Sequence, residues 1–202
     1  MPGVTWLRAA ALLGLATTVL AAGCGDDQPS GSGSDPAEES SETPAKPPSG
    51  WRTVRNERAG FTVSAPHTWS ASTKGPATLI RSDDELVSIT VAADRTAGAR
   101  GRNPGAFARA TIENLPGFRG RVPERTRPVG GSPYKTARVD ARGRVETSKL
   151  PQRITAAVYQ RPGLVTFAVL VFRNAKVKPR FNDPVVERLL HSFRAQAPDF
   201  TP

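Results

Sequence analysis

The composition of this chain changes abruptly between residues 50 and 51, and that change limits which part can fold. Residues 25–50 are mainly Ser, Gly, Pro, Asp and Glu, with no aromatic and no large aliphatic side chain. Such a stretch has too little apolar surface to offset the entropy lost on ordering, so we predict a disordered linker. Any hydrophobic core must therefore come from residues 51–202, which are enough for one domain.

An apolar leader precedes the linker. Residues 9–20 carry no charge and follow the single basic residue Arg8. As a helix this run would span about 18 Å at ~1.5 Å per residue, well short of a ~30 Å bilayer core. The run therefore predicts the core of a signal peptide rather than a membrane span.

Cys24, the only cysteine in the chain, directly follows the small residues that end this leader. The order from Leu20 to Cys24 resembles the lipobox of bacterial lipoproteins, in which the cysteine receives a diacylglycerol and becomes the new N-terminus. Ala21 stands where the usual lipobox has leucine. The resemblance implies cleavage between Gly23 and Cys24 and a lipid anchor at the outer face of the cell membrane. The alternative is that Cys24 is an ordinary residue at the edge of the leader.

Four segments are expected from these boundaries: a signal peptide at 1–23, a lipidated N-terminus and acidic linker at 24–50, a folded domain at 51–195, and a tail at 196–202. The linker has a net charge of −5, whereas residues 51–202 hold 26 basic and 12 acidic residues, a net charge of +14. An excess of this size favours anionic partners for the domain.

Hydrophobic periodicity predicts strands and helices in mixed order within the domain. Strands are expected at 60–65, 78–80, 86–93, 136–146, 154–160 and 164–172, and helices at 104–115 and 184–193. Pro162-Gly163 predicts a hairpin between the last two strands. The second of these strands is almost wholly apolar, so we expect it to be central and covered. This order predicts an α+β fold, an antiparallel sheet with helices packed on it.

Residues 136–146 show the clearest strand pattern. Small apolar residues share one face, and the other face holds Arg138, Asp140, Arg142, Arg144 and Glu146. The charged face predicts a sheet with one side in water. In the closing helix we expect Asp183 to be the N-cap, Pro184 to start the first turn, and the apolar stripe to face the sheet.

Several of these features together resemble the PsbP-like domain. They are Gly60-Phe61 leading to Pro66 and Trp69, the long apolar hairpin, and the closing helix that ends in Leu190-His191-Ser192-Phe193. That domain occurs in photosystem extrinsic proteins, a nuclear-import accessory factor and many actinobacterial lipoproteins. The resemblance covers most of 51–195 and implies a non-enzymatic accessory or binding module.

Candidate catalytic or metal-binding residues are few. His67 and His191 have no second ligand at a suitable spacing, and we interpret them as a turn residue and a helix-flank residue. The sequence has no hydrolase elbow, no phosphate-binding loop and no zinc-protease motif. We therefore expect no enzymatic activity, no cofactor and no metal.

Two further clusters are interpreted as turns. Asp83-Asp84-Glu85 predicts a charged turn between two strands, with a weak cation site as the alternative. The segment from Gly130 to Pro133 predicts a turn into the next strand, since no helix follows to present its N–H groups to a phosphate.

Arginine is the strongest chemical bias of the domain. Between residues 95 and 127 there are eight arginines, with the densest group formed by Arg119, Arg121, Arg125 and Arg127. Guanidinium groups bind phosphate and carboxylate bidentately, so this group is a candidate anion-binding patch. The alternative is a set of arginines scattered over a solvated surface.

The expected partners follow from charge and export. They are the membrane, through acyl chains on Cys24, and an acidic envelope protein, an anionic headgroup or an envelope polymer. Nucleic acid is not expected, because the leader predicts export and no aromatic residues alternate with the basic ones. Three functions remain open: a non-enzymatic binding module of the envelope, a carrier of a lipid or other apolar ligand between sheet and helices, and a hydrolase without a recognisable motif.

Overall fold

A computed structural model describes residues 47–148, 150–161, 164–176 and 179–196. The predicted leader, Cys24 and nearly all of the predicted linker lie outside these residues, as does the tail beyond residue 196. The elements follow in the order β1 (Trp51–Asn56), β2 (Phe61–Pro66), β3 (Ser70–Lys74), β4 (Ala77–Arg81), β5 (Val87–Asp94), α1 (Ala97–Arg100), α2 (Pro104–Glu113), β6 (Arg119–Arg121), β7 (Lys135–Arg144), β8 (Gln152–Arg161), β9 (Val165–Asn174), α3 (Pro179–His191) and β10 (Arg194–Ala195).

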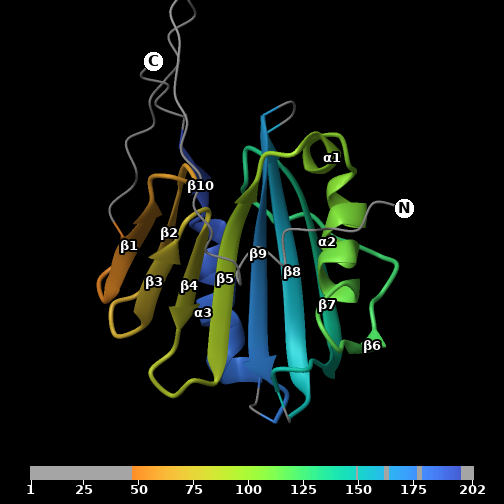
Figure 1. Cartoon of the computed structure of the whole chain (residues 1–202). Helices are drawn as coiled ribbons and strands as arrows, with labels where there is room; N and C mark the ends of the chain where they lie inside the picture. Colours follow the sequence, from red (N-terminus) through yellow and green to blue (C-terminus); the bar gives the residue numbers. More distant parts are fainter. Residues whose placement is uncertain (1–46, 149, 162–163, 177–178, 197–202) are drawn as a thin grey trace, which may run out of the picture. The chain divides into compact units, whose positions relative to one another are not determined.

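The strands form two antiparallel sheets (Figure 1). The larger has the order β3-β4-β5-β9-β8-β7-β6, and the smaller has the order β1-β2-β10. The predicted hairpin is confirmed as β8 and β9, paired from Gln152↔Asn174 to Arg161↔Val165. The apolar strand β9 lies between β5 and β8, as its composition predicts, and is buried along most of its length.

The main core lies between one face of the large sheet, the small sheet and α3. Phe193, just after α3, is its centre: its ring stacks on Tyr159 at 4.3 Å and lies 5.1 Å from Phe167 and 6.0 Å from Phe61 between ring centroids. Each aromatic pair adds about 0.5–1.5 kcal/mol beyond the burial of area. The predicted inward stripe of the closing helix is thus confirmed, with Leu189 and Leu190 also buried.

The other face of the large sheet is covered by α2, which lies over β7 and β8 (Figure 1). Asn103 caps this helix by accepting hydrogen bonds from the N–H groups of Gly105 and Ala106, and Pro104 is the first helical residue, as predicted. Phe107 and Ile112 are buried on its sheet-facing side. The two longer helices therefore cover opposite faces of one sheet.

The start predicted for the closing helix is wrong. Helix α3 begins at Pro179, so Pro184 lies inside it and Asp183 is a helical residue rather than the N-cap. Pro179 can itself occupy a first helical position, where a missing N–H costs nothing. Pro184 removes one backbone hydrogen bond within the helix. The carboxylate of Asp183 is consequently available to the sheet below.

The water-exposed face predicted for residues 136–146 is confirmed only for Arg142, Arg144 and Glu146, which are exposed, and it is wrong for the first half of the strand. On β7, Arg138 is 5% exposed and Asp140 is partly buried. The physical reason is that α3 crosses this face and carries acidic side chains that pair with the arginines. Both faces of β7 are therefore covered over part of its length.

Candidate functional site

A row of arginines crosses three neighbouring strands on the face that α3 covers. Arg142 of β7 is the register partner of Arg153 of β8, and Arg153 is the partner of Arg173 of β9. The side chains of Arg153 and Arg173 are only 10% and 4% exposed, while Arg142 is exposed at the edge. Like charges directly opposite one another in a sheet are destabilising. This arginine row (Arg142, Arg153 and Arg173) therefore requires compensation from nearby anions.

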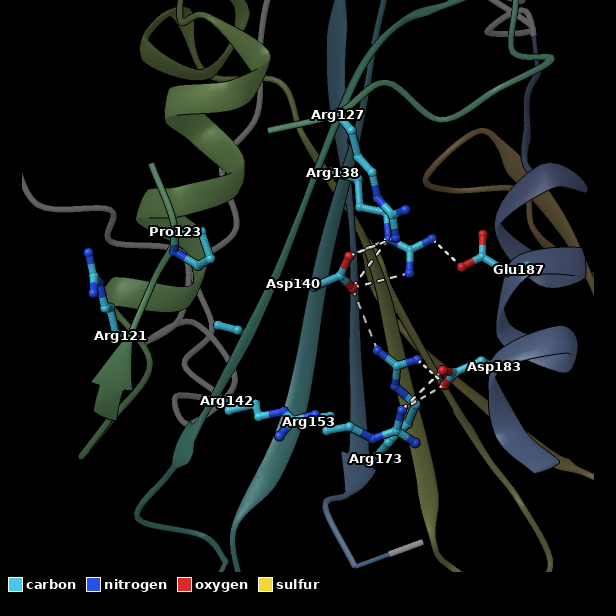
Figure 2. A pocket seen from close by; sticks show the side chains of 11 residues that line it. Arg121, Pro123, Arg127, Arg138, Asp140, Arg142, Arg153, Arg173, Asp183 and Glu187 are labelled. Carbon is cyan, nitrogen blue, oxygen red and sulfur yellow. Dashed lines mark hydrogen bonds and ion pairs between the residues drawn. The ribbon is translucent and has the colours of Figure 1, made fainter. Parts of the chain in front are cut away.

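Asp140 supplies part of that compensation from within the sheet. Its carboxylate accepts hydrogen bonds from Thr155, from Arg138 at 3.1 Å (Nη2 to Oδ1) and from Arg127 at 2.9 Å (Nη2 to Oδ2). Arg173 Nη2 lies 3.7 Å from Asp140 Oδ1 and donates to the hydroxyl of Thr155. A single carboxylate thus links arginines from two strands and from the segment between β6 and β7 (Figure 2).

Helix α3 supplies the remaining acids. Asp183 Oδ1 accepts from Arg153 Nη1 at 3.0 Å and from Arg173 Nη1 at 2.6 Å, and Glu187 accepts from Arg138 Nη1. Residues four apart lie on the same side of a helix, which is why Asp183 and Glu187 both face the sheet. Figure 2 shows both acids directed at the arginines from the helix. Polar pairing fixes the N-terminal half of α3, and apolar packing fixes its C-terminal half.

These side chains line an open pocket of about 450 Å³. Its wall contains Arg121, Arg127, Arg138, Arg142, Arg153 and Arg173, the acids Asp140, Asp183 and Glu187, and also Pro123 and Ala141. Six guanidinium groups against three carboxylates leave a formal charge of +3. The pocket is therefore suited to an anion.

Part of the hydrogen-bonding capacity of the buried arginines is unused. Nε and Nη2 of Arg153 and Nε of Arg173 are buried and have no hydrogen-bond partner among the described residues. Leaving a buried donor unsatisfied costs roughly 1–3 kcal/mol, more for a charged group. Nε and Nη2 form one edge of the guanidinium fork, the arrangement that binds two oxygens of one oxyanion.

The electrostatics of the site follow from these contacts. Burial alone would raise the pKa of Asp140, but the Thr155 hydrogen bond and the Arg138 charge outweigh it and hold that pKa below its usual value. Burial lowers the pKa of Arg173; Asp183 opposes this effect and Arg153 adds to it. Arg173 remains charged, since a guanidinium keeps its proton at any physiological pH. Its charge is thus held in an unfavourable position that a further anion would relieve.

The structure brings together only part of the arginine group singled out in the sequence. Arg121 of β6 and Arg127 line the pocket, whereas Arg119 and Arg125 are exposed outside it. Arg121 and Arg142, which are register partners, have no side-chain hydrogen bond or ion pair with another described residue. The anion-binding role of the four arginines stays a prediction.

The buried arginines were missed, although the sequence contains a signal for them. Arg153 and Arg173 are charges near the ends of two apolar strands, and the antiparallel pairing of β8 with β9 places them opposite each other. Combining the turn with the strand periodicity would have found this pair. Of the two arginines predicted on a solvated face of β7, Arg142 is exposed and Arg138 is buried.

The other candidate residues have structural roles or lie apart. His67 lies in the turn after β2 and His191 ends α3, both exposed. Asp84 is confirmed in a turn between β4 and β5: the hydrogen bond from Ser82 and that from the N–H of Leu86 lower its pKa. The segment from Gly130 to Pro133 is confirmed as a turn before β7.

Within the described ranges, no three His, Cys, Asp or Glu side chains are grouped so that they could hold a metal ion. Across the same ranges, no helix combines the length and hydropathy needed to cross a bilayer.

No family model and no curated protein sequence matches this chain. Solved structures do match. The solution structure of cyanobacterial PsbP (CyanoP) from Synechocystis has a TM-score of 0.50 and 12% identity, covering 75% of this chain and 95% of that one. This likeness and the antiparallel sheet with its helices show the fold: it is the PsbP-like α+β fold.

Two further matches have lower scores. LpqN of Mycobacterium tuberculosis, described as involved in cell envelope biogenesis, has a TM-score of 0.45 and 14% identity over 73% of this chain and 91% of its own. A crystal structure from Bacteroides thetaiotaomicron has a TM-score of 0.45 and 11% identity over 72% of this chain. This chain spans about half of that protein, 48% of its length.

Proposed function

We propose that this chain is an exported lipoprotein, held at the outer face of the cell membrane by acyl chains on Cys24, whose domain binds an anionic envelope component without transforming it. One observation supports the proposed binding role of the domain. It is the open pocket of about 450 Å³, with a formal charge of +3, on the face covered by α3. The anchor rests on the sequence around Cys24.

Binding is favoured over catalysis by the residue types in this pocket. Its lining residues include no histidine, cysteine, serine or lysine. Guanidinium groups donate hydrogen bonds but do not exchange protons near neutral pH. Asp140, Asp183 and Glu187 each already accept from an arginine, and the pKa of Asp140 is lowered, so it is a poor proton donor. The pocket can therefore hold an anion but lacks a nucleophile with its base.

The two alternative functions gain no support from this site. A carrier of an apolar ligand needs a cavity lined mainly by apolar side chains. This pocket is lined mainly by charged ones. A hydrolase built on His67 or His191 would need polar groups converging on that histidine, and neither histidine lines the pocket.

The anchor is tested by replacing the proposed lipid acceptor. Cells expressing the full chain or its Cys24→Ala variant are fed a labelled fatty acid and fractionated into membrane, cytosol and medium. We expect labelled protein in the membrane for the natural chain and unlabelled protein outside the membrane fraction for the variant. Equal amounts of both proteins in the membrane would exclude anchoring through Cys24.

The binding role is tested by capture in intact cells. A photo-reactive amino acid replaces Pro123 at the pocket, and a matched protein carries it at Ser72 on the exposed strand β3. We expect an anionic envelope component to be cross-linked from position 123 and not from position 72. Capture of the same component from both positions, or from neither, would contradict binding at this pocket.

A further inference from the structure

The pocket on the arginine row has features that specify the ligand more narrowly than its charge alone. We propose that Arg142, Arg153 and Arg173, together with Arg121, form a binding site for a phosphomonoester group carried by a lipid headgroup or an envelope polymer. This inference rests on the proposed function, because it names the ligand class of the same binding module.

The first argument is the unused edge of Arg153. Its Nη1 is occupied by Asp183 at 3.0 Å, but Nε and Nη2 have no partner among the described residues. The side chain is 10% exposed and lines the pocket. A buried, charged donor pair without a partner is costly, and an acceptor with two oxygens removes that cost. Bidentate binding of one oxyanion satisfies both atoms at once.

The second argument is the position of the exposed arginines. Arg142 is next to Arg153 in the sheet, and Arg121 is next to Arg142 on the edge strand β6. Both arginines line the pocket, and neither has an ion-pair partner among the residues the structure describes. Four arginines from four adjacent strands thus line one pocket. In Figure 2, Arg142, Arg153 and Arg173 lie along one row, and Arg121 lies apart from them at the edge.

The third argument separates phosphate from carboxylate. A carboxylate carries one negative charge and two oxygens, and Asp183 already provides such a group to Arg153 and Arg173. A phosphomonoester carries about −1.5 to −2 charges near pH 7 and three acceptor oxygens. It therefore neutralises more of the +3 excess and can accept from the edge of Arg153 and from the exposed arginines together.

The size of the pocket fits a phosphate with an attached group. Pockets for small ligands occupy roughly 300–1,000 Å³, and this one measures about 450 Å³. Its open side leaves room for a glycerol or sugar beyond the phosphate.

The test measures binding of glycerol phosphate to the full chain in detergent by calorimetry, with acetate as the carboxylate comparator. We expect a dissociation constant in the millimolar range or tighter and much weaker binding of acetate. Arg142→Gln and Arg121→Gln should each weaken glycerol phosphate binding about tenfold, because each removes a charged hydrogen bond.

The matched controls are Arg144→Gln and Arg119→Gln. These arginines lie two positions away on the same strands, are exposed, and do not line the pocket. They remove the same charge, and we expect little change. Equal weakening by both members of a matched pair, acetate binding as tightly as glycerol phosphate, or no saturable binding would each overturn the proposal.

Two further arms identify the source of the phosphate. One uses a polysaccharide that carries phosphomonoester groups, and the other uses mixed micelles containing phosphatidic acid, whose headgroup is a phosphomonoester. If Arg142→Gln weakens binding and Arg144→Gln does not, the binding is specific to the pocket. Specific binding in the polymer arm alone identifies an envelope polymer as the source, and specific binding in the micelle arm alone identifies a lipid headgroup. If no phosphate probe binds, but Cys24→Ala still loses the label and leaves the membrane fraction, the phosphate site is rejected and the proposal of an anchored lipoprotein stands.

Discussion

Asp140 is the residue on which the charge balance of the pocket most depends. It contacts Arg138, Arg127 and Thr155 directly and lies 3.7 Å from Arg173. Arg138 and Arg173 are each about 5% exposed and cannot be solvated by water if this carboxylate is lost. Removing one member of a buried ion pair is more costly than the pair is stabilising, because the other charge stays buried.

Asp140→Asn should therefore destabilise the domain. We expect a loss of about 2–3 kcal/mol in the free energy of unfolding, below the ~3–5 kcal/mol typical of fully buried pairs because Asp140 itself is partly exposed. Chemical denaturation at neutral pH measures the change. Asp83→Asn, at an exposed turn position, is the control and should alter stability by less than about 0.5 kcal/mol. A result for Asp140→Asn as small as that of the control would contradict this account.

The same residue predicts a pH dependence. The pKa of Asp140 in the folded protein is lowered below its value of ~3.9 in the unfolded chain. Its contribution to stability is therefore complete above about pH 4 and is lost as pH falls through the folded pKa. Below pH 4, the denaturation midpoint should fall more steeply with decreasing pH for the natural protein than for Asp140→Asn. Asp84, whose pKa is also lowered, is present in both proteins and therefore does not account for the difference. Parallel curves would show that Asp140 is not responsible.

At the scale of elements, strand β6 illustrates how a short segment is held in place to present one side chain. It has three residues, and its central Gly120 pairs with Gly143 of β7. A Cβ at position 143 would lie 2.5 Å from a ring carbon of Phe118 and 2.9 Å from the carbonyl oxygen of Arg119. The absence of side chains here lets Phe118 pack over the pair and holds Arg121 beside Arg142.

Gly143→Ala should consequently displace β6. We expect a destabilisation of about 1–3 kcal/mol from overpacking, since Phe118 and the backbone of β6 must move. Gly98→Ala in α1 is the control, because no atom lies within 4 Å of its added Cβ. That change should be neutral or stabilising by up to about 1 kcal/mol. Thermal unfolding of the two variants tests this prediction. Equal unfolding midpoints would show that the position of β6 does not depend on a glycine at position 143.

At the scale of the whole molecule, charge and composition divide the chain at residue 50. The acidic linker at 24–50 has a net charge of −5, and residues 51–202 carry +14. In the proposed arrangement the acyl chains hold one end, and the linker separates a basic domain from the membrane. The domain is then positioned to reach anionic groups of the envelope.

This arrangement predicts how the protein is released from cells. A protease specific for glutamate, added to intact cells, should cut at Glu38, Glu39 or Glu42 and free the domain into the medium. The released fragment should begin at Thr43 or a few residues earlier and remain folded by circular dichroism. Mass spectrometry of the medium makes the measurement. Retention of the intact chain on the cells after complete digestion of other surface proteins would contradict an exposed linker.

Much of the fold could be predicted because the pattern of apolar and polar residues along a short segment indicates which side of that strand or helix is buried. The alternation in β5 and β7, the antiparallel pairing of β8 with β9 and the apolar stripe ending at Phe193 all follow from periodicity and turn chemistry. The strands β1, β3, β6 and β10 and the short helix α1 were not predicted. Burial within β3 shows why, since all five of its residues are exposed and give no alternation. Such a strand forms because it pairs with β4, not because of its own pattern.

The sequence by itself determined which residues share a face, where most of the described turns lie, and that the part of the chain after residue 50 forms an α+β domain, since these depend on neighbours along the chain. Only the tertiary structure decided what covers each face. Arg138 and Glu187 are 49 positions apart, and Arg153 and Asp183 are 30 apart. No local pattern shows that a helix places acids over a charged strand. For that reason Arg138, which was expected in water, is buried in the wall of a pocket beside Arg153 and Arg173, and these last two keep donors that no described residue satisfies.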